Sequence, residues 1–407
     1  MPVWHDQTRE WVKQGKLALL GITQEQHPDR CRLFAQWQGF GWPILHDPIN
    51  LMESPAVPIV VAIDEHGIVR AIGPKPETFA RDFLDRTFDD DATRDDPRSP
   101  GPPDPDRKLV EARSRPDAGT WRAAGDALTI WGGLARITEA IRAYSEAVRI
   151  DPSDKNARFR LGVAFRMRYE SPDRKPGDFQ AAVDNWGRAL ELDPNQYIWR
   201  RRIEQYGPLL AKPYPFYDWV EKARAEIRGR GDEPIPLSEE PSGSELASPV
   251  GEFVNEAEPP VAPDPKGRID RDSKRLIEVE VAVIPRRVRP GESARVHLSF
   301  RPNAAIMAHW NNESTPLKVW VEGADGWSIH RQLLEAPQGR EAESDEVRRL
   351  DFEVKAAPEA SGKVAIAAYA LYNVCEESGG LCLFLRQDLN IEVEIDDPRR
   401  PEPTPRD

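Results

Sequence analysis

The sequence is poor in cysteine, in long apolar runs and in positive charge, and each shortage excludes a class of protein. Three cysteines in 407 residues, at positions 31, 375 and 382, exclude a fold that is held together by a framework of disulfides. No run reaches the roughly 18 apolar residues that a membrane-spanning helix requires. With 56 Lys and Arg against 69 Asp and Glu, the net charge is −13, and such a chain repels nucleic-acid phosphates.

Familiar cofactor and metal motifs are also absent from the sequence. We find no GxSxG motif, no P-loop and no glycine pattern of the dinucleotide-binding kind. The 7 histidines show no close metal-type spacing, and neither a histidine nor a third cysteine lies near Cys375 and Cys382 in the sequence. Because these two cysteines would leave zinc short of ligands, we expect no metal site, and we expect no cofactor.

Proline, in contrast, is abundant, with 39 copies. Two Pro-rich stretches, Asp89–Asp106 and Gly231–Pro265, carry net charges of −5 and −9 and few large apolar side chains. Such stretches cannot offset the entropy of ordering, so we predict extended, self-repelling linkers. The predicted domains are 1–88, 119–230 and 275–397, joined by linkers at 89–118 and 231–274 and followed by a disordered tail at 398–407.

Residues 1–88 alternate between helical and strand patterns, which predicts an α/β domain. The short apolar run Leu17–Ile22 is typical of a parallel strand that is covered on both faces. The turn Asp64–Gly67 between two apolar stretches predicts a hairpin. The other expected elements are helices at His5–Lys13, Asp29–Trp37 and Phe79–Phe88 and strands at Ala56–Ile63 and Ile68–Arg70. Cys31 falls in one of these helices, where a lone cysteine is typically a buried small hydrophobe.

The segment Ala56-Val57-Pro58, followed by the residues IVVAIDEHGIV, resembles the thioredoxin-like fold in its TlpA/ResA branch of extracytoplasmic thiol oxidoreductases. The resemblance implies a cis-proline at Pro58 that lines an active site; the alternative is an ordinary strand-entry proline. The family's catalytic WCxxC and its first strand are missing from this sequence. Met1-Pro2 resembles a pair that follows the CxxC in that family, so we expect Met1 to be an internal methionine of a longer product. The alternative is a degenerate domain that only binds.

Residues 119–230 contain an internal repeat of the form Ala-x3-aromatic-x2-Ala-x3-Asp-Pro. The first copy runs from Ala140 to Pro152 and the second from Ala182 to Pro194, and each Asp-Pro pair ends a predicted helix. The pattern resembles the second helix of a tetratricopeptide repeat, with an inserted loop at Ser171–Asp178. The resemblance implies an all-α domain that binds proteins or spaces its neighbours, and the sequence leaves both roles open.

From about residue 275 the apolar period changes to two. Alternating strands are predicted at Leu276–Ile284, Ala294–Phe300, Leu317–Val321, Leu350–Val354, Lys363–Tyr372 and Leu389–Ile395. Several short alternating strands with turn signals between them favour an immunoglobulin-like antiparallel β-sandwich. If Ser378-Gly379 forms a two-residue turn, Cys375 and Cys382 lie opposite each other within disulfide reach. A disulfide across so short a loop is typically reducible.

This pattern, with the segment His309-Trp310-Asn311-Asn312 and the motif Tyr372-x-x-Cys375, resembles the N-terminal (alpha) domain of DsbD. The resemblance implies that Cys375 and Cys382 exchange disulfides with extracytoplasmic protein partners. It makes Tyr372, His309 and Trp310 candidate site-lining residues. The alternatives are a structural disulfide and two unpaired buried thiols. The neighbouring Glu376 and Glu377 are expected to raise the pKa of these thiols.

Together these features predict a multidomain thiol:disulfide interchange protein. A Cys375–Cys382 dithiol carries the exchange and a repeat domain binds protein partners; no nucleic acid or membrane-spanning segment is expected. Whether the chain is an enzyme stays open, because the CxxC is absent. The alternative is a non-enzymatic scaffold with a degenerate thioredoxin fold and a structural disulfide. The family resemblances imply a periplasmic or other extracytoplasmic location, although the sequence begins without a signal peptide.

Overall fold

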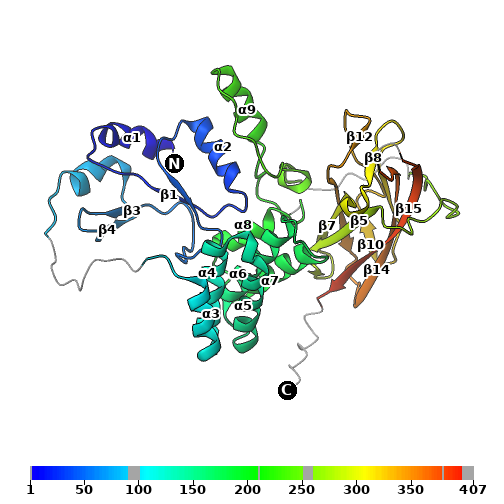
Figure 1. The fold of residues 1–407 in the computed structure, drawn as a ribbon, viewed down its shortest axis with the longest axis horizontal. Helices are drawn as coiled ribbons and strands as arrows, with labels where there is room; N and C mark the ends of the chain where they lie inside the picture. The colour runs from blue at the N-terminus through cyan, green and yellow to red at the C-terminus, as the bar shows by residue number, and fades with distance from the viewer. Residues whose placement is uncertain (1, 90–100, 210, 251–259, 378–379, 397–407) are drawn as a thin grey trace. The chain divides into compact units, whose positions relative to one another are not determined.

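The computed structural model describes residues 2–89, 101–209, 211–250, 260–377 and 380–396. The chain combines helices and sheets in a multidomain α/β arrangement, as the sequence predicted at this coarse level (Figure 1). It divides into two compact units. Unit 1 comprises Met1–Asp173, Arg188–Arg201 and Asp218–Glu240, and unit 2 comprises Arg174–Gly187, Arg202–Tyr217 and Pro241–Asp407. The predicted tail at 398–407 and the predicted turn at Ser378-Gly379 lie outside the described residues.

The first part of unit 1 consists of short strands between helices. Its elements are α1 (Pro2–Lys13), β1 (Gly21–Thr23), α2 (Pro28–Gln38), β2 (Ile44–His46), β3 (Val61–Ile63) and β4 (Val69–Ile72). Strand β1 pairs with β2 in parallel, and β3 pairs with β4 as an antiparallel hairpin. The hairpin confirms the prediction. Its turn is held by Asp64, whose carboxylate accepts hydrogen bonds from the backbone N–H groups of His66 and Ile68.

The strand predicted at Leu17–Ile22 is wrong in extent and in burial. Strand β1 begins only at Gly21, and the side chains of Leu20 and Ile22 are 58% and 45% exposed. An apolar strand is buried on both faces only if other elements cover both faces of its sheet. A local apolar run does not show whether such elements are present. Strand β2, which β1 pairs with, was missed. The predicted closing helix is shorter than expected, with a 3-10 turn at Pro76–Thr78 and a π-helical turn at Ala80–Leu84.

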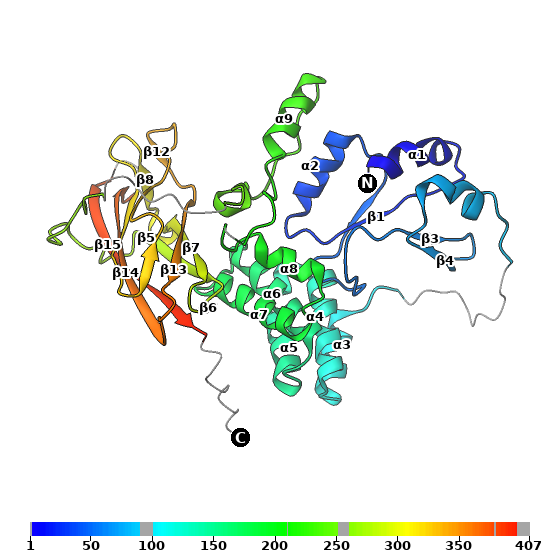
Figure 2. The same ribbon diagram turned by 180° about the vertical axis from the view of Figure 1, so that it is seen from behind.

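The helices that follow match the repeat pattern closely. They are α3 (Pro105–Ser114), α4 (Ala118–Ala127), α5 (Ile137–Ile150), α6 (Lys155–Tyr169), α7 (Asp178–Leu192), α8 (Tyr197–Glu204) and α9 (Val220–Gly229) (Figure 2). Helices α5 and α7 end just before the two Asp-Pro pairs, as predicted. The small and aromatic residues of the repeat are fully buried, namely Ala140, Tyr144, Ala147, Ala182, Trp186 and Ala189.

Both segments that were predicted as linkers contain ordered structure. Helix α3 lies within 89–118, and its N-terminus is capped by Asp104, whose side chain accepts from the backbone N–H groups of Asp106 and Arg107. In the second segment, Glu240 pairs with Arg224 at 2.6 Å and Asp264 pairs with Arg386 at 2.9 Å. The prediction of linkers was based on the charge within each segment. It did not include Arg224 and Arg386, which lie outside the segment and neutralise Glu240 and Asp264 in the folded chain.

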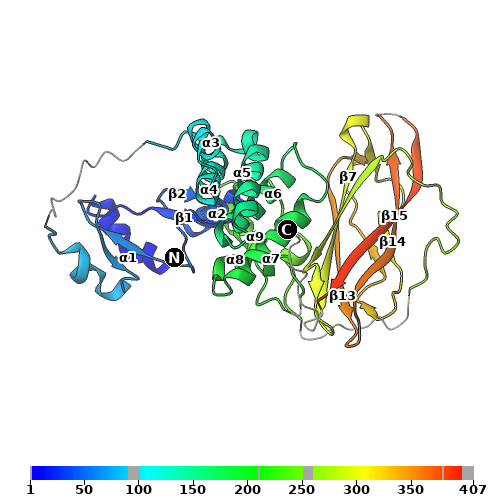
Figure 3. The same ribbon diagram turned by 90° about the horizontal axis from the view of Figure 1, so that it is seen from below.

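Unit 2 contains two sheets (Figure 3), which share one apolar core and are antiparallel except where β6 pairs with β15 in parallel. The four-stranded sheet has the order β10 (Trp327–Ile329), β13 (Arg348–Ala356), β7 (Ser293–Pro302) and β5 (Ile277–Ile284). The seven-stranded sheet is built on β11 (Leu333–Glu335), β9 (Lys318–Val321), β14 (Lys363–Cys375), β15 (Cys382–Ile395) and β6 (Arg287–Val288). Strand β8 (His309–Asn311) also pairs with β14, and β12 (Glu343–Ser344) pairs with β8. All six predicted strands are present, and β7, β13, β14 and β15 are longer than predicted.

The shared core explains why these strands alternate. Phe300 and Phe352 of the first sheet and Trp310 of the second belong to the same cluster of buried side chains. Successive side chains of a strand point to opposite faces, so each strand contributes every second residue to this core. The other residues of each strand form the outer faces of the sheets, and the two cysteines lie on such a face.

Candidate thiol–disulfide site

The two cysteines are joined at the end of the hairpin formed by β14 and β15. The register of this hairpin runs from Lys363 opposite Glu394 to Cys375 opposite Cys382, and the Cα atoms of the cysteines are 3.9 Å apart. The structure therefore contains a disulfide between Cys375 and Cys382 rather than two separate thiols. The long ladder of pairs aligns the two residues by itself, because a slip of one residue would move every apolar side chain of β14 to the wrong face.

The two sulfur-bearing residues differ in exposure. Cys375 is only 1% exposed, whereas Cys382 is exposed. Thiol–disulfide exchange requires a thiolate to approach one sulfur directly, so access decides which sulfur is attacked. Cys382 is therefore the more accessible end of the disulfide, and Cys375 is the buried end.

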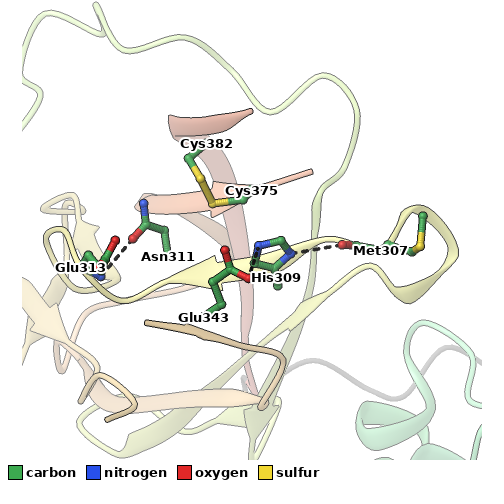
Figure 4. Close-up of a disulfide and its surroundings, with 7 residues drawn as sticks. All are labelled: Met307, His309, Asn311, Glu313, Glu343, Cys375 and Cys382. Atoms are coloured by element: carbon green, nitrogen blue, oxygen red, sulfur yellow. Dashed lines mark hydrogen bonds and ion pairs between the residues drawn. A yellow bond between two sulfur atoms is a disulfide. The ribbon is translucent and has the colours of Figure 1, made fainter. Parts of the chain in front are cut away.

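His309 lies on the other side of Cys375. Strand β8 pairs with β14 so that His309 is opposite Cys375 and Trp310 is opposite Val374. Directly opposed residues of antiparallel strands point to the same face and have Cα atoms about 4.5–5.5 Å apart. Cys382, Cys375 and His309 thus form a row across three neighbouring strands, and Figure 4 shows the imidazole next to Cys375.

The His309 ring lies between two oxygen atoms. Its Nδ1 contacts the carbonyl oxygen of Met307 at 3.3 Å, and its Nε2 lies 3.4 Å from a carboxylate oxygen of Glu343 (Figure 4). The side chain of His309 is 12% exposed, and that of Glu343 is 50% exposed. Glu343 belongs to β12, and sequence reasoning missed it because it is 34 positions away from His309 along the chain.

The other two candidate site-lining residues of this unit lie on the opposite face of the sheet. Trp310 and Tyr372 are fully buried in the shared core, where their rings meet edge to face at 6.0 Å. Trp310 donates to the carbonyl oxygen of Glu346 at 2.8 Å, and the Tyr372 hydroxyl donates to Asp272 at 2.9 Å. Burial and the nearby Asp272 carboxylate raise the pKa of Tyr372 well above its usual range. Neither ring shares a face with the disulfide, so only His309 of these candidates is brought to it.

The acidic neighbours of the disulfide are partly neutralised. Glu376 pairs with Lys274 at 2.7 Å. The sequence led us to expect that Glu376 and Glu377 both raise the pKa of the cysteine thiols, but Lys274 offsets the charge of Glu376. This lysine is 102 residues from Glu376 along the chain, which is why the local sequence gives no sign of it.

The remaining candidate residues of the sequence analysis belong to unit 1. The Val57–Pro58 peptide bond is cis, as the resemblance implied. Cys31 is a free thiol in α2 and is partly buried. Burial raises the pKa of the Cys31 thiol, and a hydrogen bond with Thr23 partly offsets that shift. Unit 1 contains no other cysteine, so the described residues place no dithiol beside Pro58.

The described residues contain no group of three or more His, Cys, Asp or Glu side chains that is arranged to hold a metal ion. No helix in the described part of the chain is long and apolar enough to cross a membrane.

Comparison of this chain with known proteins gives no match by sequence and only structural matches of low identity. No family model matches the chain, and no curated protein matches it. Among solved structures, AggA, the major subunit of aggregative adherence fimbriae type I of Escherichia coli, is 12% identical over 30% of this chain and 95% of its own, with a TM-score of 0.18. The sporulation control protein Spo0M of Bacillus subtilis is 16% identical over 29% of this chain and 49% of its own, with a TM-score of 0.16. A FixG-related protein of Vibrio parahaemolyticus is 10% identical over 29% of this chain and 96% of its own, with a TM-score of 0.14.

Proposed function

We propose that this chain is a thiol:disulfide interchange protein that works through Cys375 and Cys382. The observation that carries the proposal is one disulfide with a buried and an exposed end on the outer face of a sheet. A disulfide that only stabilises a hairpin gains little here, because the closed loop is short and the ladder of β14 and β15 already aligns its ends. A disulfide that exchanges needs one accessible sulfur, and Cys382 supplies it.

The exchange balances in both directions. When a partner thiolate attacks the Cys382 sulfur, the bond between the two cysteines breaks, and its electron pair stays on the Cys375 sulfur as a thiolate. The partner's second thiolate then attacks the partner's sulfur in the mixed disulfide and releases Cys382, so the partner is oxidised and this chain is reduced. In the reverse direction Cys382 attacks a partner disulfide, and Cys375 then attacks Cys382 and releases the partner as a thiol.

The finer fold assignments belong to the same proposal. We infer that the two sheets of unit 2 form an immunoglobulin-like sandwich of the DsbD alpha-domain type, a reading that their shared core supports. The helices α5 to α7, with buried residues at the repeat positions, support a tetratricopeptide-repeat scaffold that binds protein partners. The hairpin of β3 and β4 with the cis Val57–Pro58 bond supports a thioredoxin-like module in residues 1–88. An extracytoplasmic, oxidising compartment suits a disulfide that is repeatedly formed.

Thiol trapping tests the proposal. In Cys375→Ser the remaining Cys382 is exposed, and we expect it to capture protein partners as mixed disulfides that a reductant releases. In Cys382→Ser the remaining Cys375 is buried, and we expect little capture. Cys31→Ser in both variants removes the third thiol. Equal capture by both variants would contradict the proposal. The proposal would also fail if neither variant captured a partner and strongly reducing dithiols could not open the wild-type disulfide.

The second candidate function is a non-enzymatic scaffold. It is favoured by unit 1, where no dithiol lies beside the cis-proline in the described residues and where large apolar side chains such as Ile63 and Ile72 are exposed on β3 and β4. Under this reading the helices bind partners and the disulfide is structural. Partner binding that survives replacement of both Cys375 and Cys382 by serine, combined with no trapping, would favour the scaffold.

A further inference from the structure

Deepening the proposed function, on which this inference rests, we infer that His309, as an imidazolium, stabilises the Cys375 thiolate when the disulfide opens, and that Met307 and Glu343 orient its ring. Three observations carry the inference: the position of His309 beside Cys375, the two acceptors of its ring, and the charges that surround the pair.

The position of His309 is fixed by strand pairing. Cys375 has Cys382 opposite it on β15 and His309 opposite it on β8, so Cys375 lies between these two residues. Cys375 is 1% exposed and the His309 side chain is 12% exposed. Water therefore screens the interaction between the ring and a charge on Cys375 only weakly.

The His309 ring has an oxygen atom beside each of its nitrogens. A neutral imidazole donates from one nitrogen and accepts at the other, whereas both nitrogens of the cation donate. Both ring nitrogens of His309 face oxygen acceptors, the Met307 carbonyl oxygen and the Glu343 carboxylate. An imidazolium at this position therefore has an oxygen atom beside each N–H group.

His309 is a basic side chain directly opposite Cys375, and the other charges near the pair are carboxylates and one lysine. On β12, Glu343 faces the ring; at the end of β14, Glu376 is paired with Lys274, and Glu377 is exposed. The carboxylates alone would disfavour a thiolate at Cys375. In the paired strands, the residues directly opposite Cys375 are Cys382 on β15 and His309 on β8.

The chemistry needs such a cation at the bond-breaking step. When a partner thiolate attacks Cys382, negative charge moves onto the Cys375 sulfur as the bond between the cysteines breaks. A leaving thiol with a lower pKa leaves faster, so a cation beside Cys375 accelerates the opening of the disulfide. In the reverse direction the same cation keeps Cys375 ionised and ready to attack Cys382. His309 does not exchange electrons; it stabilises the sulfur that does.

The test measures the pKa of Cys375 directly. In the full chain with Cys31→Ser and Cys382→Ser, Cys375 is the only thiol, and its ionisation is followed by thiolate absorbance near 240 nm during a pH titration. We expect His309→Gln to raise the Cys375 pKa by about 1 unit or more, the size typical for loss of a nearby opposite charge. His309→Lys keeps a cation, and we expect it to restore a pKa closer to that of the parent.

Two controls keep the outcome interpretable. His309→Asn provides a second neutral variant, and near-UV circular dichroism of each variant shows whether the sheet is intact. An unchanged Cys375 pKa in the folded neutral variants would overturn the inference, and so would an equal rise in the lysine variant, which would indicate a structural role.

A separate measurement distinguishes this inference from the proposed function. With both cysteines present, we expect dithiothreitol to reduce the disulfide more slowly in His309→Gln than in the wild type. If the wild-type disulfide exchanges with dithiols but His309→Gln reacts at the same rate, the role of His309 fails while the exchange function stands. If no variant exchanges, the exchange function fails, and the Cys375 pKa still reports on His309.

Discussion

Lys212 is 5% exposed, and its ammonium group donates hydrogen bonds to the carbonyl oxygens of Gln205 and Ser244. Burial, together with the repulsion of Arg295, lowers the pKa of Lys212 to about 8. Nearby carboxylates, Glu245 among them, favour the charged form without reversing that shift. At Lys212 the loss of contact with water lowers the pKa more than the nearby carboxylates raise it, because the described hydrogen bonds of the ammonium group go to carbonyl oxygens.

The depressed pKa of Lys212 predicts how stability changes with pH. Between about pH 8 and 10.5 the unfolded chain binds more protons at this lysine than the folded chain does, so the free energy of unfolding rises as pH rises through this range. We expect the wild type to gain about 1 to 3 kcal/mol relative to Lys212→Met between pH 7.5 and pH 10.5. Urea unfolding of both proteins at the two pH values measures this difference. A constant difference would contradict the prediction.

At the scale of elements, one glycine sets how closely α4 approaches α5. A Cβ atom at Gly125 of α4 would lie 2.5 Å from the ring of Tyr144 on α5, a distance that real Cβ contacts do not show. Tyr144 is fully buried, and its hydroxyl donates to Asp126 at 2.9 Å. Asp126 in turn pairs with the buried Arg160 of α6 at 2.8 Å, so a shift of the ring would disturb a polar network inside the helices.

Gly125→Ala is therefore expected to destabilise the protein even though alanine favours helices. The added methyl group must displace the Tyr144 ring, and overpacking of this kind costs about 1–3 kcal/mol. Gly187→Ala in α7 is the matched control, because a Cβ atom there meets nothing within 4 Å. The control should be neutral or stabilise by up to about 1 kcal/mol. Thermal unfolding monitored by far-UV circular dichroism compares the two, and equal effects would contradict the close approach.

At the scale of the whole molecule, the negative charge of the chain is concentrated in two stretches of sequence. The stretches Asp89–Asp106 and Gly231–Pro265 carry net charges of −5 and −9, against −13 for the whole chain, so the remaining sequence is close to neutral. Some of the acids in these stretches are nevertheless paired in the folded chain. Asp264 is 6% exposed, accepts hydrogen bonds from the backbone N–H groups of Arg268 and Ile269, and pairs with Arg386 of β15. Here an acidic segment is attached to a sheet.

Loss of the Asp264 carboxylate should release this attachment. We expect Asp264→Ala to make the segment around Arg268 and Arg271 several times more sensitive to trypsin, because both the pair with Arg386 and the turn at Asp264 are lost. Asp325→Ala, at an exposed turn of the same unit, serves as the control. Limited proteolysis with mass spectrometry identifies the cleaved bonds. Equal cleavage of both variants would show that Asp264 does not hold the segment.

The sequence by itself determined the elements whose pattern is local. Period-two apolarity gave the strands β5, β7, β9, β13, β14 and β15, and the Asp-Pro pairs marked the ends of α5 and α7. The spacing of Cys375 and Cys382 in a predicted hairpin was enough to place them opposite each other. These predictions succeeded because each depends on neighbours in the chain, where side-chain periodicity and the missing N–H of proline act directly.

Only the tertiary structure decided the features that depend on distant residues. It showed that Cys375 is buried while Cys382 is exposed, that Lys274 pairs with Glu376, and that Glu343 accompanies His309. It also placed Trp310 and Tyr372 in the core, although their neighbours in the sequence lie at the disulfide. The face on which a side chain lies follows from strand register, and its charge environment follows from segments dozens to a hundred residues away. Those pairings are fixed by packing of the whole unit, which a local pattern of residues does not encode.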